Sequence, residues 1–425
     1  MAERITAPKG TYDILPQDQP VRRWLVACAE EIFRRYGYGR LDTPMFEETR
    51  LFARGVGEST DIVRKEMYTF ADMGGRSMTL RPEGTASAAR AYVEHGMHTW
   101  PQPVKLWYHW PMFRYESPQS GRYRQHWQFG IEAFGSDSPM LDAEVIGVLA
   151  ALYDHIGLAQ VELRLNSMGC RECRPAYAAE LRRFLEVHAP ALCPECRART
   201  RLNPLRTFDC KVEGCRAVMV GAPRLTDSLC PACAEHHTAV QAYLGLQGIA
   251  FVSDHRLVRG MDYYTRTTFE FQSAILGAQA GVGGGGRYDN LVEAIGGPPT
   301  PGVGFGTGVE RILLALTRSR QDLPEGRRPA AYLVALTEAA REAVFVLAHD
   351  LRRQGAAADL DFLGRSVKGQ MKQAARSRAK FAAIIGDDEL AGGTITLKRL
   401  STGQEERLPR IDAIARIVEA ERDGA

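Results

Sequence analysis

The fold is decided by residues 104–134, VKLWYHWPMFRYESPQSGRYRQHWQFGIEAF, where two aromatic-rich segments flank a polar turn. Residues alternate in character from Val104 to Glu116 and again from Tyr123 to Phe134, which is typical of β-strands. Residues 117–122 contain serine, proline and glycine, the composition of a turn. The segment therefore predicts a long antiparallel hairpin.

The chain has 425 residues, enough for two or three domains. Its 45% apolar and 25% charged residues exclude a largely disordered, collagen-like or coiled-coil chain. The net charge is only +3, so a nucleic-acid partner would have to be bound by local basic patches. There is no run of about 18 uncharged apolar residues. Charged residues also occur among the first twenty, where a signal peptide would need an apolar run. We therefore expect a cytoplasmic protein with no membrane span and no signal peptide.

Changes of pattern along the chain predict its organisation. Helical periodicity occupies residues 17–36 and 142–156, and strand periodicity occupies 161–165. Glycine is dense at 281–286 and 302–308, before an apolar helix signal at Ile312. We interpret the rest as a small inserted domain at 170–240, a polar linker at 323–331 and a separate α/β domain at 332–425.

Eight of the nine cysteines lie in the predicted insertion, where reduced thiols favour metal binding. The spacing is C-x2-C-x19-C-x2-C for Cys170, Cys173, Cys193 and Cys196, then C-x4-C-x14-C-x2-C for Cys210, Cys215, Cys230 and Cys233. Either half resembles a tetrahedral zinc site, and the pairing could also interleave. Buried reduced thiols without metal are the alternative; we expect at least one structural zinc site. Cys28, outside this region, is interpreted as a small core residue.

Polar residues on the hairpin indicate a binding face. Arg114 and Glu116 share one side of the first strand, and Gln128 and Glu132 share one side of the second, because strand side chains alternate. A guanidinium binds phosphate oxygens through paired hydrogen bonds, and a carboxylate accepts from an amino group or an imidazole N–H. The face suits an anionic nucleotide beside a cationic ligand. An ordinary solvent-exposed face is the alternative.

Three further clusters carry chemistry. Thr79–Thr85 places Glu83 and a hydroxyl between a proline and a helix start, where they would hold an ammonium group or simply complement the helix dipole. Arg259–Tyr264 sets a cation beside two phenols. Gly304–Arg311 brings Arg311 behind permissive glycines, where it would meet phosphate or a base, without the Walker lysine or the Rossmann fingerprint.

Taken together, these motifs resemble a known family. Phe113-Arg114-Tyr115-Glu116 and the stretch ending in Glu310-Arg311 resemble motifs two and three of the class II aminoacyl-tRNA synthetases, and Pro44 after a helix resembles motif one. Thr79–Thr85, Arg259–Tyr264 and GGGGRYD at 283–289 closely resemble the signatures of the histidyl-tRNA synthetase family, in the same order. The resemblance covers nearly the whole chain.

The resemblance implies an α+β fold. A class II antiparallel sheet of six strands with flanking helices would form the catalytic domain at 1–169 and 241–322, interrupted by the insertion at 170–240 and followed by an anticodon-binding domain at 332–425. It also implies the reaction. ATP with Mg²⁺ would activate L-histidine to histidyl-adenylate, and tRNA(His) would accept the amino acid. The family further implies a homodimer.

The resemblance assigns the nucleotide to three arginines and a carboxylate. Arg114 would hold the α-phosphate, Arg311 would contact the phosphates and adenine, and Arg259 would stabilise the transition state. Glu116 is also expected at the ATP site. Both reaction steps build negative charge, which preorganised cations stabilise.

Histidine would be bound by a second group of residues. Glu83 and Thr85 would bind its α-amino group, and Gln128 would face the amino acid. The remaining members would read or enclose the imidazole: Glu132 and Tyr264 as readers, Tyr263 and Tyr288 as walls. A pocket with buried polar groups rejects ligands that leave them unpaired.

For tRNA, Arg365, Lys368, Lys372 and Arg376 are spaced to lie on one side of a helix, although a solvated helix face has the same pattern. Arg122 in the hairpin turn would contact backbone phosphates near the acceptor end.

Two other functions are alternatives to this one. One is the synthetase-like regulatory subunit of ATP phosphoribosyltransferase, which typically lacks the anticodon domain and loses the histidine signature. The other is a zinc-dependent RNA-binding module, which leaves Glu83, Arg114 and Arg311 without a role.

Overall fold

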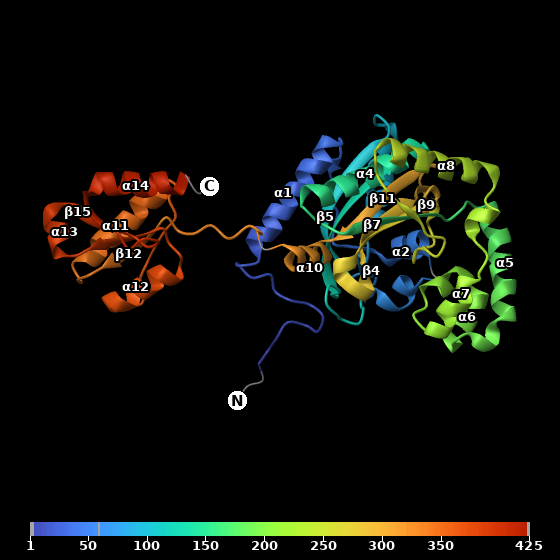
Figure 1. Ribbon diagram of the computed structural model, residues 1–425, viewed down its shortest axis with the longest axis horizontal. Helices are drawn as coiled ribbons and strands as arrows, with labels where there is room; N and C mark the ends of the chain where they lie inside the picture. Colours follow the sequence, from blue (N-terminus) through green and yellow to red (C-terminus); the bar gives the residue numbers. More distant parts are fainter. Residues whose placement is uncertain (1–3, 58–59, 321, 423–425) are drawn as a thin grey trace. The chain divides into compact units, whose positions relative to one another are not determined.

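The computed structural model describes residues 4–57, 60–320 and 322–422. The chain divides into a first unit that ends at Leu323 and a second that begins at Pro324 (Figure 1). In the described part of the chain, no helix is both long and apolar enough to cross a bilayer.

The first unit is built on one large sheet. Its strands lie in the order β1 (Gly39–Arg40), β5 (Val104–Phe113), β6 (Gln125–Phe134), β11 (Gly302–Gly308), β10 (Gly281–Arg287), β9 (Thr265–Ser273), β7 (Val161–Ser167) and β8 (Val252–Ser253). The central strands, from β5 to β7 in that order, pair antiparallel. Only the two-residue edge strands β1 and β8 pair parallel with their neighbours. The predicted antiparallel sheet and its hairpin are confirmed.

Alternation along β6 gives the sheet two different faces. Phe129 and Ile131 lie in the main hydrophobic core, whereas Gln128 and Glu132 point to the other side. The register sets Tyr108 of β5 opposite Gly130 and Leu106 opposite Glu132. Polar groups of the hairpin therefore gather on the face away from the main core.

Four helices cover the core face: α1 (Gln19–Arg35), α4 (Pro139–His155), α8 (Pro231–Leu246) and α10 (Val309–Ser319). Their apolar residues, such as Phe33, Ile146 and Ile312, form one buried cluster with the sheet. The predicted helix at 142–156 begins earlier, at Pro139, because the Ser138 hydroxyl caps it by accepting from the backbone N–H of Met140.

The opposite face carries smaller elements that leave a crevice open. They are the sheet of β2 (Phe46–Glu48), β4 (Ser77–Leu80) and β3 (Tyr68–Ala71), the helices α2 (Thr49–Val56), α3 (Thr85–Glu94) and α9 (Leu291–Ala294), and the short turns η1 (Ile62–Glu66) and η2 (Met97–Thr99). The turn η6 (Ala274–Gln279) instead contacts α10 on the core face. Buried Arg81 ties this layer to the hairpin by donating to the carbonyl oxygens of Pro111 and Thr43. It thereby fixes the segment that carries Glu83.

The insertion is a small helical body. It consists of α5 (Cys173–Val187), α6 (Pro194–Leu202) and α7 (Glu213–Val220), joined by the turns η3 (Ala189–Ala191), η4 (Pro204–Asp209) and η5 (Leu225–Ser228). Its own core is short, with Tyr177, Leu181 and Met219 among its members. Helix α8 then returns to the large sheet, where Val240 joins the main core.

The second unit is a five-stranded sheet with helices on both faces. The strands lie in the order β13 (Ala358–Leu360), β12 (Ala331–Ala335), β14 (Phe381–Ile385), β15 (Thr394–Arg399) and β16 (Glu405–Pro409). The helices are α11 (Ala340–Arg353), α12 (Val367–Arg376), α13 (Asp387–Gly392) and α14 (Arg410–Arg422). Helices α11 and α14 pack on one face and α12 on the other, which confirms the predicted α/β domain.

Candidate active site

A crevice of about 620 Å³ lies on the open face of the large sheet. It is lined by these predicted site residues: Glu83, Thr85, Arg114, Glu116, Arg122, Gln128, Arg259, Tyr263, Tyr264 and Arg311. They come from segments more than two hundred residues apart in sequence, between Glu83 and Arg311. Glu132 and Tyr288 lie behind this lining, in contact with it.

Glu83 sits at the beginning of α3. Its carboxylate oxygens accept the backbone N–H groups of Thr85 and Ala86 at 2.8 and 2.9 Å, and the Tyr263 hydroxyl lies 3.4 Å away. Glu83 therefore complements the helix end, as one of its two interpretations expects, and it also lines the crevice. Burial raises the pKa of Glu83, although the two backbone N–H groups oppose this.

Glu132 is fully buried and surrounded by hydroxyl groups. It accepts from Thr85 Oγ1 at 2.8 Å, from Tyr108 Oη at 3.0 Å and from Tyr288 Oη. Burial raises its pKa to about 8. Glu132 thus forms a polar floor whose partners Thr85 and Tyr108 are exposed to the crevice.

Aromatic rings close the same end of the crevice. The rings of Tyr263 and Tyr264 are 4.7 Å apart, and that of Tyr288 is 5.7 Å from Tyr263. All three residues are buried. A planar polar ring would be enclosed here by phenols on several sides.

Arg114 enters the crevice just beyond the end of β5. Its Nε donates to the carbonyl oxygen of Pro82 at 2.7 Å, and its Nη1 lies 3.7 Å from Glu116. Glu116 also pairs with Arg122 at 3.3 Å. The Nε side of the Arg114 guanidinium is therefore hydrogen-bonded to the backbone directly before Glu83.

Arg259 is anchored to β9. Its Nε donates to Thr268 Oγ1 at 2.9 Å, its Nη2 donates to the carbonyl oxygen of Phe269, and its Nη1 is 3.4 Å from Glu270. Gly284 on the neighbouring strand makes room, since a Cβ there would stand 2.4 Å from Nη2. This close approach explains one glycine of the dense stretch.

Arg311 lies in the first turn of α10, where burial and the nearby Arg122 lower its pKa. Two cations held this close favour an anion between them. Glu310, next to Arg311, turns away and accepts from Tyr12, Arg22 and the backbone N–H of Trp127. These contacts fix the start of the helix.

Sequence patterns missed several residues that line the crevice, among them Tyr108, Glu270 and Lys211. Tyr108 lies in an aromatic-rich strand in which nothing distinguishes it from core residues. Glu270 alternates with core phenylalanines in β9, a signal that could have found it. Lys211 comes from the insertion, and only the tertiary structure shows that this part of the insertion lies beside the crevice.

The predicted tRNA residues lie in the second unit, apart from Arg122. Lys368, Lys372 and Arg376 are exposed on α12. The prediction that Arg365 lies on this helix is wrong, because the Ser366 side chain caps the N-terminus of α12, which begins at Val367. Arg365 instead pairs with Asp361 at 2.6 Å.

The eight cysteines of the insertion form two groups, and the pairing interleaves. We name Cys170, Cys173, Cys230 and Cys233 the outer quartet, and Cys193, Cys196, Cys210 and Cys215 the inner quartet. The spacing left the pairing open, and the structure groups cysteines from both halves of the sequence, because the chain leaves the outer quartet, completes the inner one and returns. Cys28 is a buried core residue of α1, as predicted.

Comparisons with known proteins show which family the chain is similar to. The family model described as Histidyl-tRNA synthetase matches residues 10–312, and the model described as Anticodon binding domain matches residues 330–420. The chain is 49% identical over 403 residues to a histidine–tRNA ligase of Desulforamulus reducens, covering 95% of this chain and 96% of that protein. It is 51% identical over 404 residues to that of Moorella thermoacetica, covering 95% of each. The crystal structure of apo Staphylococcus aureus histidyl-tRNA synthetase has a TM-score of 0.80 and 38% identity, covering 98% of this chain and all of that one.

Proposed function

The chain belongs to the histidyl-tRNA synthetase family, and on that premise we propose a role for each group around the crevice. Its activity is that of a histidine–tRNA ligase. The carboxylate of histidine attacks the α-phosphorus of ATP and pyrophosphate leaves. The 3′-terminal adenosine hydroxyl of tRNA then attacks the activated carbonyl, and AMP leaves. The observation that carries the assignment of roles is that Glu83, Arg114, Arg259 and Arg311 line one crevice.

Histidine occupies the end of the crevice enclosed by tyrosines. The α-ammonium group binds Glu83 and Thr85, while Gln128 faces the carboxyl-bearing part. The imidazole meets Tyr264 and, between Thr85 and Tyr108, the buried Glu132. Tyr263 and Tyr288 form the walls. An amino acid without ring nitrogens cannot hydrogen-bond to Glu132 and Tyr264 in this way, which selects against it.

ATP occupies the end that is lined by arginines. Arg114 binds the α-phosphate, Arg311 binds the phosphates and adenine, and Arg259 stabilises the charge that develops at phosphorus. Their guanidinium groups are oriented before the substrate arrives, because backbone carbonyls and Thr268 hold Arg114 and Arg259. Preorganised donors of this kind stabilise a transition state more than they stabilise the bound substrate.

The carboxylates of Glu116 and Glu270 line the crevice, and carboxylate oxygens are ligands that Mg²⁺ takes beside nucleotide phosphates. These two residues therefore fit a magnesium site. When Mg²⁺ is bound with ATP, it neutralises phosphate charge.

The tRNA contacts both units. Lys368, Lys372 and Arg376 on α12 bind the phosphate backbone of tRNA(His) near the anticodon, and Arg122 binds phosphates near the acceptor end. Arg365 acts with them from the turn before α12. Exposed cations on one helix are the usual electrostatic footprint of backbone binding.

Further proposals concern the state of the protein. We assign one structural Zn²⁺ to each cysteine quartet, a homodimer in solution and a place in the cytoplasm, where translation consumes the product. Family membership supports the last two, and the convergence of four thiols supports the first.

The regulatory-subunit alternative is not favoured. The anticodon-domain match at 330–420 and the position of Arg259–Tyr264 in the crevice both argue against it.

Histidine-dependent exchange of labelled pyrophosphate into ATP tests the proposal. We expect exchange with histidine and none with phenylalanine or glutamine. Arg114→Ala should abolish it, whereas Lys398→Ala, which removes a cation paired with Glu405 in the second unit, should leave it unchanged. Exchange that survives Arg114→Ala would contradict the assigned roles.

A further inference from the structure

We propose that zinc bound by the two cysteine quartets holds the histidine end of the crevice in shape, so that loss of zinc weakens histidine binding while nucleotide binding persists. The inference rests on the proposed function of the crevice. It adds a dependence of amino-acid binding on the metal content of the insertion.

The geometry of the quartets suits zinc. In the outer quartet, Cys170 Sγ lies 3.7 Å from the Sγ atoms of both Cys173 and Cys230. In the inner quartet, the Sγ atoms of Cys193 and Cys210 are 4.0 Å apart. A tetrahedral Zn²⁺ with bonds of about 2.3 Å to sulfur requires sulfur atoms about 3.8 Å apart. A disulfide requires about 2.05 Å.

Backbone N–H groups are arranged to stabilise thiolates in both quartets. The N–H of Cys170 donates to Cys173 Sγ at 3.1 Å, and that of Cys193 donates to Cys215 Sγ at 3.2 Å. Gly169 has φ +62°, and a Cβ there would stand 2.7 Å from Cys173 Sγ. Only glycine lets the chain approach the outer quartet in this way.

The first connection to the crevice starts beside Cys173. Arg174 donates from Nε to the carbonyl oxygen of Met168 at 3.2 Å and from Nη2 to the carbonyl oxygen of Tyr264. The backbone N–H of Arg266 donates to Gly169 at 2.8 Å. The segment that leads into the outer quartet is therefore hydrogen-bonded to Tyr264 itself and to Arg266, near the start of β9.

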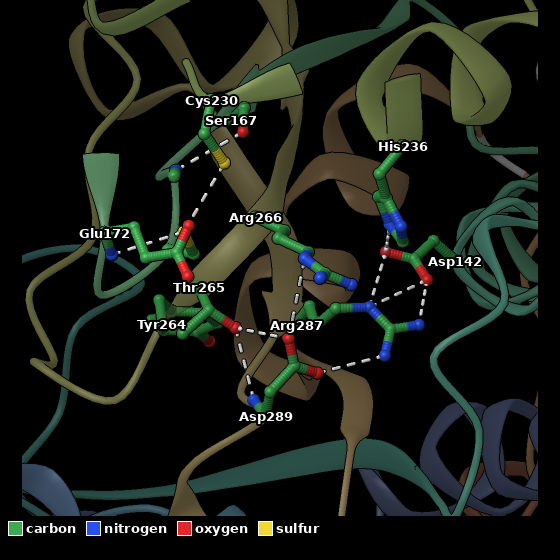
Figure 2. A network of polar contacts seen from close by, with 12 residues as sticks. Asp142, Ser167, Glu172, Cys230, His236, Tyr264, Thr265, Arg266, Arg287 and Asp289 are labelled. Atoms are coloured by element: carbon green, nitrogen blue, oxygen red, sulfur yellow. Dashed lines mark hydrogen bonds and ion pairs between the residues drawn. The ribbon is translucent and has the colours of Figure 1, made fainter. Parts of the chain in front are cut away.

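The second connection starts on α8, three residues after Cys233. Figure 2 shows Asp142 between His236 and Arg287: Asp142 Oδ1 is 3.2 Å from His236 Nε2 and 3.1 Å from Arg287 Nε. Arg287 also pairs with Asp289 at 3.1 Å, and Asp289 accepts from Thr265 at 3.2 Å.

Two members of this second connection, Arg287 and Asp289, flank Tyr288 in sequence, and the Tyr288 hydroxyl donates to Glu132. Asp142 and Arg287 are completely buried. A buried ion pair loses several kcal/mol when one partner is displaced, so a shift of α8 would be transmitted to the floor of the pocket.

The inner quartet has a third connection. Arg206, four residues before Cys210, donates to the carbonyl oxygen of Gly260 at 3.0 Å and pairs with Asp61 at 2.7 Å. Lys211, directly after Cys210, lines the crevice. This quartet therefore holds the insertion against the loop from Arg259 to Tyr264.

The insertion needs bound metal for its stability because its own apolar core is small. Metal bound only by the folded state adds its binding free energy to folding. By contrast, Arg114 directly follows β5, a central strand of the large sheet, and Arg311 lies in α10, which packs in the main core. The nucleotide end is thus predicted to tolerate loss of zinc, whereas the histidine end is not.

The test uses the full chain. We expect about one zinc ion per quartet by elemental analysis. Removal with a zinc-selective chelator in excess Mg²⁺ should weaken histidine binding at least about tenfold by calorimetry, equivalent to about 1.4 kcal/mol. Binding of ATP should change less than about threefold, and added Zn²⁺ should restore histidine binding.

Further variants distinguish zinc binding itself from the effect of bound zinc on the histidine end of the crevice. Cys170→Ser with Cys230→Ser should lose one zinc ion, whereas Cys28→Ala, outside the quartets, should lose none. Arg174→Ala should keep both zinc ions and still weaken histidine binding about tenfold, which remains informative if the cysteine variant does not fold.

Iron or no metal in the purified chain would overturn the zinc assignment. Unchanged histidine affinity after zinc removal or in Arg174→Ala would overturn the transmission, and so would an equal loss of ATP binding. If the zinc-loaded wild-type chain binds ATP but not histidine, the proposed roles in the crevice fail, whereas the zinc content still decides the metal assignment.

Discussion

Gly304 lies directly opposite Glu132 in the sheet, and a Cβ at Gly304 would stand 2.1 Å from Glu132 Oε2. Because Gly304 has no side chain, the buried carboxyl group of Glu132 can occupy the floor of the pocket. Two elements more than 160 residues apart in sequence thus make one site.

Gly304→Ala is expected to displace Glu132 and weaken histidine binding. Overpacking costs about 1–3 kcal/mol, so the dissociation constant measured by calorimetry should rise roughly tenfold or more. Gly39→Ala is the control in the same sheet, because its nearest neighbour would be the Lys105 carbonyl oxygen at an ordinary 3.9 Å. Equal affinities in both variants would contradict the role of this contact.

Glu83→Gln is expected to remove the anchor of the α-amino group. A hydrogen bond to a charged group contributes about 1.5–3 kcal/mol, so histidine should bind at least about tenfold more weakly. Imidazolepropionate lacks the amino group, and its affinity should not fall. If the variant lowers the affinity of both ligands equally, Glu83 does not read the amino group.

Arg259→Ala is expected to slow adenylate formation by at least about 10², while histidine affinity is preserved, because the cation acts on charge that develops during reaction. Single-turnover formation of histidyl-adenylate measures the first quantity and calorimetry the second. Parallel losses in rate and affinity would show that Arg259 acts on the bound substrate instead.

Glu132 should make stability depend on pH. Burial raises its folded-state pKa from 4.5 to about 8, so the folded state holds a proton that the unfolded state releases. The stabilisation is complete below the unfolded-state pKa and is lost as the pH rises through about 8. Glu132→Gln cannot lose this proton.

Melting temperatures at pH 5 and pH 8.5 test this prediction. Relative to Glu132→Gln, the wild type should lose at least about 2 °C over that interval, since about 1 kcal/mol shifts Tm by 2–4 °C in domains of this size. A constant difference between the two proteins would mean that Glu132 is ionised throughout.

Lys368→Ala combined with Lys372→Ala should weaken tRNA binding without changing pyrophosphate exchange. The slope of log K against log salt concentration should become shallower by the equivalent of roughly one to two phosphate contacts. Filter binding across a salt series gives the slope. The control is Lys398→Ala, which removes a cation paired with Glu405 in the same unit. An unchanged slope in the double variant would exclude these lysines from the backbone contact.

Local patterns predicted much of the fold because they depend on neighbours in sequence. The period of two placed Gln128 and Glu132 on one face of β6, and apolar periodicity located α1 and α4. The motif resemblance named ten of the residues that line the crevice, including Arg259 and Arg311 from the later part of the sequence.

By itself, the sequence determined the antiparallel hairpin and the C-terminal α/β unit, since each follows from the alternation or spacing of adjacent residues. Only the tertiary structure decided that the cysteines interleave, that Arg365 stands before its helix and that Gly304 faces Glu132. These relationships depend on strand register and loop closure between distant segments, which residue spacing along one segment does not encode.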